Sequence, residues 1–212
     1  MTTHALTTIR RAFALAALPA LAAAILVAAP VAARTPVDPN TLNPAPPDFF
    51  NASCYLGAGG TICDLHFADP ANPIVDEPSG IVCGTTEVLF SQNRWVVGKR
   101  FYDADGNLVQ RHFREELVGT LTNPDTGTSV PWIQHDTVLH NLSVPGDQDS
   151  GITRITGLTS RFYLPGGGTV QIDAGTSTQD HNGLLSESGQ HPINDYFAGD
   201  SGALQPVCDA LS

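Results

Sequence analysis

The feature that most constrains the fold is a pair of long alternating runs within residues 94–120, RWVVGKRFY and LVQRHFREELVGT. In the second run, Val109, Phe113 and Leu117 fall on one face. The residues on the other face are Gln110, His112, Arg114 and Glu116. A period of two is typical of a half-buried β-strand. The segment DADGN at 103–107 joins the runs with residues that favour tight turns, so the stretch predicts a β-hairpin.

Further extended runs follow, separated by turn-forming clusters such as NPDTG at 123–127 and PGDQDSG at 145–151. No long window after the N-terminal leader shows a helical period. Connections this short exclude parallel β-α-β crossovers. We therefore predict an all-β fold: a single antiparallel β-barrel of six to eight strands in an up-and-down meander, with a β-sandwich as the alternative. Closure would leave no open sheet edge on a chain with one lysine to protect it.

Residues 1–33 have the form of a secretory signal peptide. Arg10 and Arg11 precede an apolar run rich in Ala and Leu, and small residues stand before a cleavage position after Ala33. The alternative is a membrane anchor, because the run is about long enough to span a bilayer, but Pro19 and Pro30 interrupt it. The two arginines also resemble a twin-arginine export signal, although the general export route fits equally well. We predict secretion, without membrane insertion after cleavage.

The exported part divides into a linker and one domain. Residues 34–53 contain five prolines and predict an extended, Pro-rich linker. Residues 54–212 are then one barrel domain, long enough to bury a core. The whole chain has a formal net charge of −11, and loss of the two leader arginines makes the exported part more acidic. Such a surface repels nucleic acid and anionic lipid, which excludes both as partners; nothing in the sequence defines an oligomeric state.

All four cysteines lie in the predicted exported part, where an even number indicates two disulfides. Three connectivities are open. We favour Cys54–Cys63, which closes a short glycine-rich loop, and Cys83–Cys208, which ties the tail to the first long strand. The alternative, a zinc site, requires close ligand pairs such as Cys-x-x-Cys, and the sequence has none.

Two turns contain carboxylates at alternate positions, Asp103 and Asp105 in the first and Asp147 and Asp149 in the second. This spacing is similar to the start of a calcium loop, but an EF-hand requires Gly at position six, whereas Gly106 stands at position four. Turn formation accounts for all of these residues. We therefore predict no metal or cofactor, and the four aspartates remain the calcium candidates if the two loops share a site.

His140 is the candidate for chemistry because it lies among apolar residues on a face predicted to point inward, together with Asp136 and Val138. One interpretation is a histidine at the edge of the core with a hydrogen-bonded partner. The other is a general base or a ligand contact, with Asp136 orienting the ring. Phe162 and Leu158, predicted to face inward on the next strand, complete the candidate ligand-binding set.

A mixed-charge patch, Arg111, Arg114, Glu115 and Glu116, follows the hairpin. Such patches are usually solvated faces with cross-strand ion pairs, and in a ligand-binding barrel they could line a polar mouth. Motifs of the known nucleophilic and zinc hydrolases are absent: the sequence has no Gly-x-Ser-x-Gly, Ser-x-x-Lys or His-Glu-x-x-His.

Three strings carry a resemblance: FYDADGNLVQRHF at 101–113, GTLTNPDTGTSV at 119–130 and ITGLTSRFYLPGGGTVQIDAG at 155–175. Together they resemble a group of exported actinobacterial β-barrel proteins of unknown function. The shared motifs are turn-forming sequences, so the resemblance implies an architecture and no activity. At the level of the fold alone, the hairpin meander is also similar to lipocalin-like and allene-oxide-cyclase-like barrels, from which no function follows.

Three functions are compatible with these features. The first is an exported, non-catalytic barrel that binds a small, partly apolar ligand or an envelope partner. The second is a barrel enzyme, such as an isomerase, cyclase or hydrolase, that uses His140 with a nearby acid. The third is a structural secreted protein. We favour the first, because the barrel pattern occurs without a catalytic motif.

Overall fold

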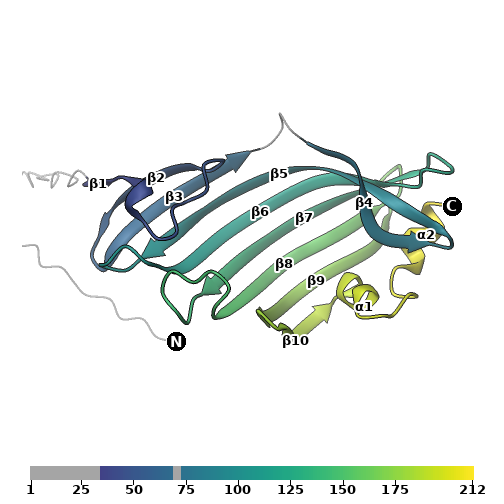
Figure 1. Cartoon of the computed structure of the whole chain (residues 1–212). Helices are drawn as coiled ribbons and strands as arrows, with labels where there is room; N and C mark the ends of the chain where they lie inside the picture. The colour runs from purple at the N-terminus through teal and green to yellow at the C-terminus, as the bar shows by residue number, and fades with distance from the viewer. Residues whose placement is uncertain (1–33, 69–72) are drawn as a thin grey trace, which may run out of the picture. The chain divides into compact units, whose positions relative to one another are not determined.

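The computed structural model describes residues 34–68 and 73–212, and the predicted signal peptide lies outside them. Residues 34–212 form one compact unit built on a single antiparallel sheet of ten strands (Figure 1). The strands are β1 (Pro36–Val37), β2 (Asn51–Gly57), β3 (Gly60–Ala68), β4 (Ile74–Cys83), β5 (Thr86–Tyr102), β6 (Leu108–Thr122), β7 (Ser129–Asn141), β8 (Ile152–Tyr163), β9 (Thr169–Asp180) and β10 (Gly183–Gln190). Three short helices complete the fold: the 3-10 helix η1 (Pro39–Thr41), α1 (Pro192–Phe197) and α2 (Gln205–Ala210).

The predicted hairpin is the centre of the sheet. β5 and β6 pair along nearly their whole length, from Leu89 opposite Thr122 to Tyr102 opposite Leu108. The turn between them closes as its residue types predict, because the Asp103 carboxylate accepts hydrogen bonds from the backbone N–H groups of Asp105 and Asn107. The prediction from the alternating runs is confirmed.

One edge of β5 is shared by two partners. β3 pairs with the C-terminal half of β5, from Thr61 opposite Tyr102 to Ala68 opposite Trp95, whereas β4 pairs with the N-terminal half. Figure 1 shows β3 and β4 following one another along this edge. Beyond β6 the strands run in chain order to β10, which is exposed at the other edge of the sheet.

One face of the sheet carries nearly all of the buried side chains, and we call it the inner face; on β5 it bears Val88, Val96 and Arg100. Two hydrophobic clusters cover its two ends. The first joins the sheet to β4 and the C-terminal segment and consists of Ile81, Val88, Leu117, Leu121, Val130, Trp132, Phe162, Leu204, Val207 and Leu211. The second joins the sheet to the N-terminal segment and consists of Leu42, Cys54, Cys63, Leu65, Tyr102 and Leu108.

The all-β prediction is confirmed, but the predicted closed barrel of six to eight strands is wrong. The ten-stranded sheet is open, with β1 and β2 at one edge and β10 at the other. The physical reason is that the inner face is buried by other means. The segment before β2 covers one end, and β4 with the C-terminal helices covers the other, so the apolar surface is removed from water without pairing the edge strands.

The predicted Pro-rich linker is instead part of the folded unit. β1 pairs with β2, and Leu42 is buried in the second cluster. The Tyr102 hydroxyl donates a hydrogen bond to the Pro44 carbonyl at 3.0 Å, which holds the segment against β5. Proline cannot donate to a sheet but its carbonyl still accepts, so a proline-rich chain can be held in place by side-chain donors.

The predicted inward face of β8 is also wrong in part. A bulge between Leu158 and Ser160 inserts one extra residue opposite both neighbouring strands. Phe162 is therefore buried on the inner face, whereas Leu158 and Ile152 lie on the outer face. A one-residue insertion moves every following side chain to the other side of the sheet, and nothing in the alternation of the sequence announces it.

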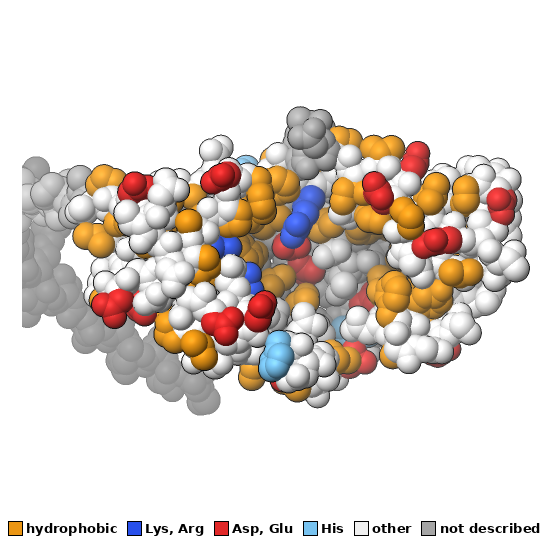
Figure 2. Space-filling model, viewed as in Figure 1, with side chains coloured by type: hydrophobic (Ala, Val, Ile, Leu, Met, Phe, Trp, Pro, Cys, Tyr) orange, Lys and Arg blue, Asp and Glu red, His pale blue; other side chains and the backbone are white. Residues whose placement is uncertain are grey.

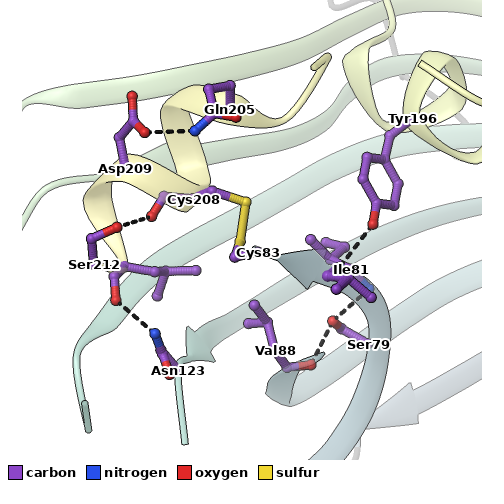
Figure 3. The surroundings of a disulfide bond; sticks show 12 residues. Ser79, Ile81, Cys83, Val88, Asn123, Tyr196, Gln205, Cys208, Asp209 and Ser212 are labelled. Carbon is purple, nitrogen blue, oxygen red and sulfur yellow. Dashed lines mark hydrogen bonds between the residues drawn. A yellow bond between two sulfur atoms is a disulfide. The ribbon is translucent and has the colours of Figure 1, made fainter. Parts of the chain in front are cut away.

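Both predicted disulfides are confirmed: Cys54–Cys63 joins opposite residues of β2 and β3, and Cys83–Cys208 joins the end of β4 to α2. Figure 3 shows the second, with hydrogen bonds on either side of it. The Val82 N–H donates to the Tyr196 hydroxyl, and the Asn123 side-chain amide donates to the Leu211 carbonyl. Together these contacts hold the C-terminal segment over the first hydrophobic cluster.

Within the described residues, no helix has the length and apolar character needed to cross a membrane.

We predict that the two disulfides differ in their contribution to stability. Cys83–Cys208 spans 125 residues and Cys54–Cys63 spans 9. Loop-closure entropy then gives about 5 kcal/mol for the first and about 2.5 kcal/mol for the second. Urea unfolding of the C83A/C208A and C54A/C63A variants, each compared with the wild type, measures the two losses. An equal loss in both variants would contradict the prediction.

Candidate functional site

The candidate site is a cavity of about 380 Å³ on the inner face, beside the N-terminal segment. We call it the groove. Figure 2 shows this side of the molecule hollowed, with Lys or Arg and Asp or Glu side chains visible in the hollow. Its lining residues come from six parts of the chain and are Pro47, Phe49, Phe50, Arg94, Val96, Arg100, Arg111, Phe113, Glu115, Val138, His140, Gln148 and Thr153.

One wall of the groove is apolar. The rings of Phe50 and Phe113 are stacked, with centroids 6.0 Å apart and planes within 5° of parallel. Phe113 lies against Gly98, its partner on β5, where a Cβ would stand 2.4 Å from the Phe113 ring. The absence of a side chain at Gly98 therefore lets the ring lie against the sheet. Val96 and Val138 extend this wall along the inner face.

The polar end of the groove is formed by two arginines. Arg100 on β5 and Arg111 on β6 are directly opposite each other in the sheet. Arg100 is 3% exposed, and its Nε has no hydrogen-bond partner. Like charges placed opposite each other on one face of a sheet repel, so this pair is unfavourable unless something compensates it.

The neighbours that receive these guanidinium groups are neutral. Gln148 Oε1 accepts from Arg100 at 3.3 Å and from Arg111 at 3.1 Å, and the Ala45 carbonyl accepts from Arg100 at 3.3 Å. None of the ion pairs between described residues includes either arginine. Burial and the charge of Arg100 lower the pKa of Arg111 from its ordinary value, and the charge of Asp149, which forms no ion pair with Arg111, offsets only part of this effect. The groove thus contains two cationic groups without a paired carboxylate.

His140 lines the groove and points inward, as its sequence position predicts. Both of its ring nitrogens are engaged. Nδ1 accepts from Arg111, whose Nε is 3.1 Å away, and Nε2 lies 2.7 Å from the Ser150 carbonyl. An Nδ1 that accepts requires a neutral ring with its proton on Nε2. Burial lowers the pKa of His140, which favours this neutral form.

Asp136 does not orient His140, contrary to the interpretation that paired them. Both residues are on the inner face of β7, but they are four positions apart, which corresponds to about 13 Å along a strand. Asp136 instead accepts a hydrogen bond from the Gln134 amide at 2.8 Å and lies opposite Glu115, which is paired with Arg94 at 2.8 Å. It belongs to a polar strip between the groove and the first hydrophobic cluster.

The structure separates the other candidate ligand-binding residues from His140. Phe162 lines a second cavity of about 220 Å³, together with Trp132 and Leu121. Leu158 lies on the outer face, because of the bulge in β8. The sequence-predicted set of His140, Phe162 and Leu158 therefore does not form one site.

The calcium candidates act as turn residues. Asp103 accepts from the backbone of its own loop, and Asp147 accepts from the Asp149 N–H at 3.0 Å. Among the residues that the structure describes, no three His, Cys, Asp or Glu side chains gather closely enough to hold a metal ion. Asp105 and Asp149 likewise belong to no such group.

A second buried polar pair lies outside the groove. His191 Nδ1 is 3.2 Å from the Asp173 carboxylate, and the other Asp173 oxygen accepts from the Ile193 N–H at 3.0 Å. Burial alone would lower the pKa of His191, but its bond to the Ser188 carbonyl and the adjacent Asp173 raise it. Since Asp173 holds the start of α1 against β9 through Ile193, this pair serves to attach the C-terminal segment.

The sequence interpretation missed Arg100 and placed Arg111 in a solvated patch. A signal was present: Arg94, Val96 and Arg100 share one parity in the first run, and Arg111 shares parity with Phe113 and Leu117 in the second. An arginine in register with apolar residues on a strand is a candidate for the inner face. Gln148, in a loop, carries no such periodic signal.

No protein-family model, curated protein or solved structure matches the chain. The candidate site therefore depends on the geometry of its own residues.

We predict that Asp136 makes stability depend on pH. Burial raises the pKa of its carboxyl group from 3.8 to about 6, so the folded chain holds this proton more tightly than the unfolded chain. Stability should fall as the pH rises from about 4 to 6, with a cost of about 3 kcal/mol above that window. Asp136→Asn should remove this cost, and its free energy of unfolding should exceed that of the wild type at pH 7 but match it at pH 4.

Chemical denaturation of both proteins at a series of pH values measures this difference. Asp105→Asn, in an exposed turn, is the control for loss of one negative charge. A constant difference between wild type and Asp136→Asn from pH 4 to 7 would show that the carboxyl group is not titrating in the fold.

Proposed function

We propose that this chain is an exported, non-catalytic protein that binds a small, partly apolar ligand in the groove. The observation that carries the proposal is the combination of a stacked aromatic wall and a polar pole in one cavity. Its volume of about 380 Å³ falls within the range of small-molecule sites, which are mostly apolar with a few converging polar groups.

The scaffold around the groove supports binding. Its wall strands, β5, β6 and β7, are the most extensively paired in the sheet, and the loop that carries Gln148 is bonded to β6 through the Gly146 N–H and the Leu108 carbonyl at 2.7 Å. A site built on paired strands is organised before the ligand arrives, so less ordering is required on binding.

The enzyme alternative has less geometric support. His140 uses both ring nitrogens within the fold, and Asp136 is distant from it and only 5% exposed. A general base must reach the proton that it removes. His140 has no free ring nitrogen, and Asp136, whose Oδ1 has no hydrogen-bond partner, is not among the residues that line the groove.

The proposal of export follows from two features. The two disulfides indicate an oxidising environment. The leader that would direct secretion lies outside the described residues and remains a prediction from the sequence, as do cleavage after Ala33 and the choice of export route.

Native mass spectrometry of the protein purified from the culture medium of its source tests the proposed function. A reproducible additional mass that disappears on denaturation is the expected result. A native mass equal to the denatured mass, in protein that then binds no apolar probe in solution, would favour a structural role instead.

We predict that filling the groove abolishes binding. Val138→Trp places an indole on the inner face of β7, and loss of the additional native mass is expected. Thr137→Trp adds the same side chain to the outer face of the same strand and should retain it. Circular dichroism establishes that each variant is folded, and ligand retention by folded Val138→Trp would contradict the proposed location.

A further inference from the structure

We propose that the ligand ends in an oxyanion, a carboxylate or a phosphate, which binds between Arg100 and Arg111 while its apolar part lies against Phe50 and Phe113. This inference rests on the proposed function of the groove and adds the chemical class of its ligand.

The first argument is charge. The two guanidinium groups lie on directly opposite positions of β5 and β6, and their hydrogen-bond acceptors are an amide, a carbonyl and a neutral imidazole. Elsewhere in the described chain, Arg34, Arg94 and Lys99 each pair with a carboxylate. Asp149 acts on Arg111 through its charge but forms no ion pair with it, and one carboxylate cannot balance two arginines. In such an acidic chain, a buried arginine pair without an ion-paired carboxylate indicates that the balancing charge comes from a ligand.

The second argument is hydrogen bonding. Arg100 is almost fully buried, and its Nε–H has no acceptor among the described residues. Buried polar groups are normally satisfied, so an unpaired donor in a cavity indicates a missing acceptor. Oxygens of a carboxylate or phosphate match the planar donors of arginine and form charge-assisted hydrogen bonds.

The third argument is shape. The arginine pair and the aromatic wall line the same groove, and Phe113 is two residues from Arg111 on the same face of β6. The distance between alternate residues on a strand is about 7 Å. A ligand with its charged end beside the arginines therefore brings its next atoms against the aromatic rings. This geometry suits an amphipathic molecule with one charged end better than a free inorganic ion.

A depression on the outer face provides the contrast. It is larger, about 550 Å³, and includes Lys99 and Arg114, but Lys99 is already paired with Asp64. A large cavity with basic residues is therefore not sufficient to indicate an oxyanion site. Arg114 is exposed to solvent, which hydrates its charge, whereas the groove holds the buried Arg100 and the half-buried Arg111 next to an apolar wall.

The test is calorimetric titration of the purified full-length mature protein with three probes that share one ring system: 2-naphthoate, 2-naphthyl phosphate and the neutral methyl 2-naphthoate. We expect at least one of the two oxyanions to bind about tenfold or more tightly than the ester, as charge-assisted bonds in a sheltered site imply. The tighter of the two oxyanions identifies the headgroup.

Variants locate the effect. Arg111→Gln should bring the affinity for the oxyanions to that of the ester, and Arg111→Lys, which keeps the charge but loses the planar donors, should recover part of the difference. Arg114→Gln removes the same charge from the outer face of β6 and should leave all three affinities unchanged. The Lys variant and the three-probe comparison in the wild type keep the test decisive if Arg111→Gln does not fold.

Two results would overturn the inference. The first contradicts only the oxyanion site, and the second also contradicts the proposed function. If the ester binds as tightly as both oxyanions, the groove still binds apolar ligands and the oxyanion site is wrong. If none of the three probes binds, both the oxyanion site and the proposed function lose their support.

Discussion

The pairing of β5 with β6 and of β6 with β7 is the constraint on which the rest of the structure depends. Its register is continuous along the inner part of the sheet and decides which side chain reaches which face. Arg100, Arg111 and His140 form one row across three strands because of this register. A slip of one residue in any of these strands would send its member of the row to solvent and bring its outward-facing residues inward.

The inner face is divided by polarity rather than filled uniformly. Two apolar clusters bury its ends, and between them lie the groove and the polar strip of Arg94, Glu115 and Asp136. The strip keeps the clusters separate, because each of its members would lose hydration if the covering segments met over it. An open sheet with covered ends and a polar middle therefore explains why a cavity remains.

Sequence patterns predicted the local structure better than the global one. The period of two in β6 and β7 identified the hairpin and the inward position of His140, and loop chemistry identified the turns and both disulfides. The sequence could not show whether the sheet is open or closed, because this depends on whether distant segments cover the inner face. The bulge in β8 was equally hidden, since an extra residue puts Leu158 and Phe162 on opposite faces without changing the type of either residue. The site was predicted in part: His140 was expected at the inner face, but its arginine partner appeared to be a solvated charge until the register placed it.

The opposition of Arg100 and Arg111 has a consequence for the whole molecule. Two cationic groups held across a ladder oppose the pairing of the strands that position them, so their repulsion acts at the centre of the sheet. An anion that neutralises the pair removes this repulsion and becomes, in thermodynamic terms, a component of the folded state. Resistance to unfolding would then rise with ligand concentration, and the measured stability of the protein would report how much ligand surrounds it.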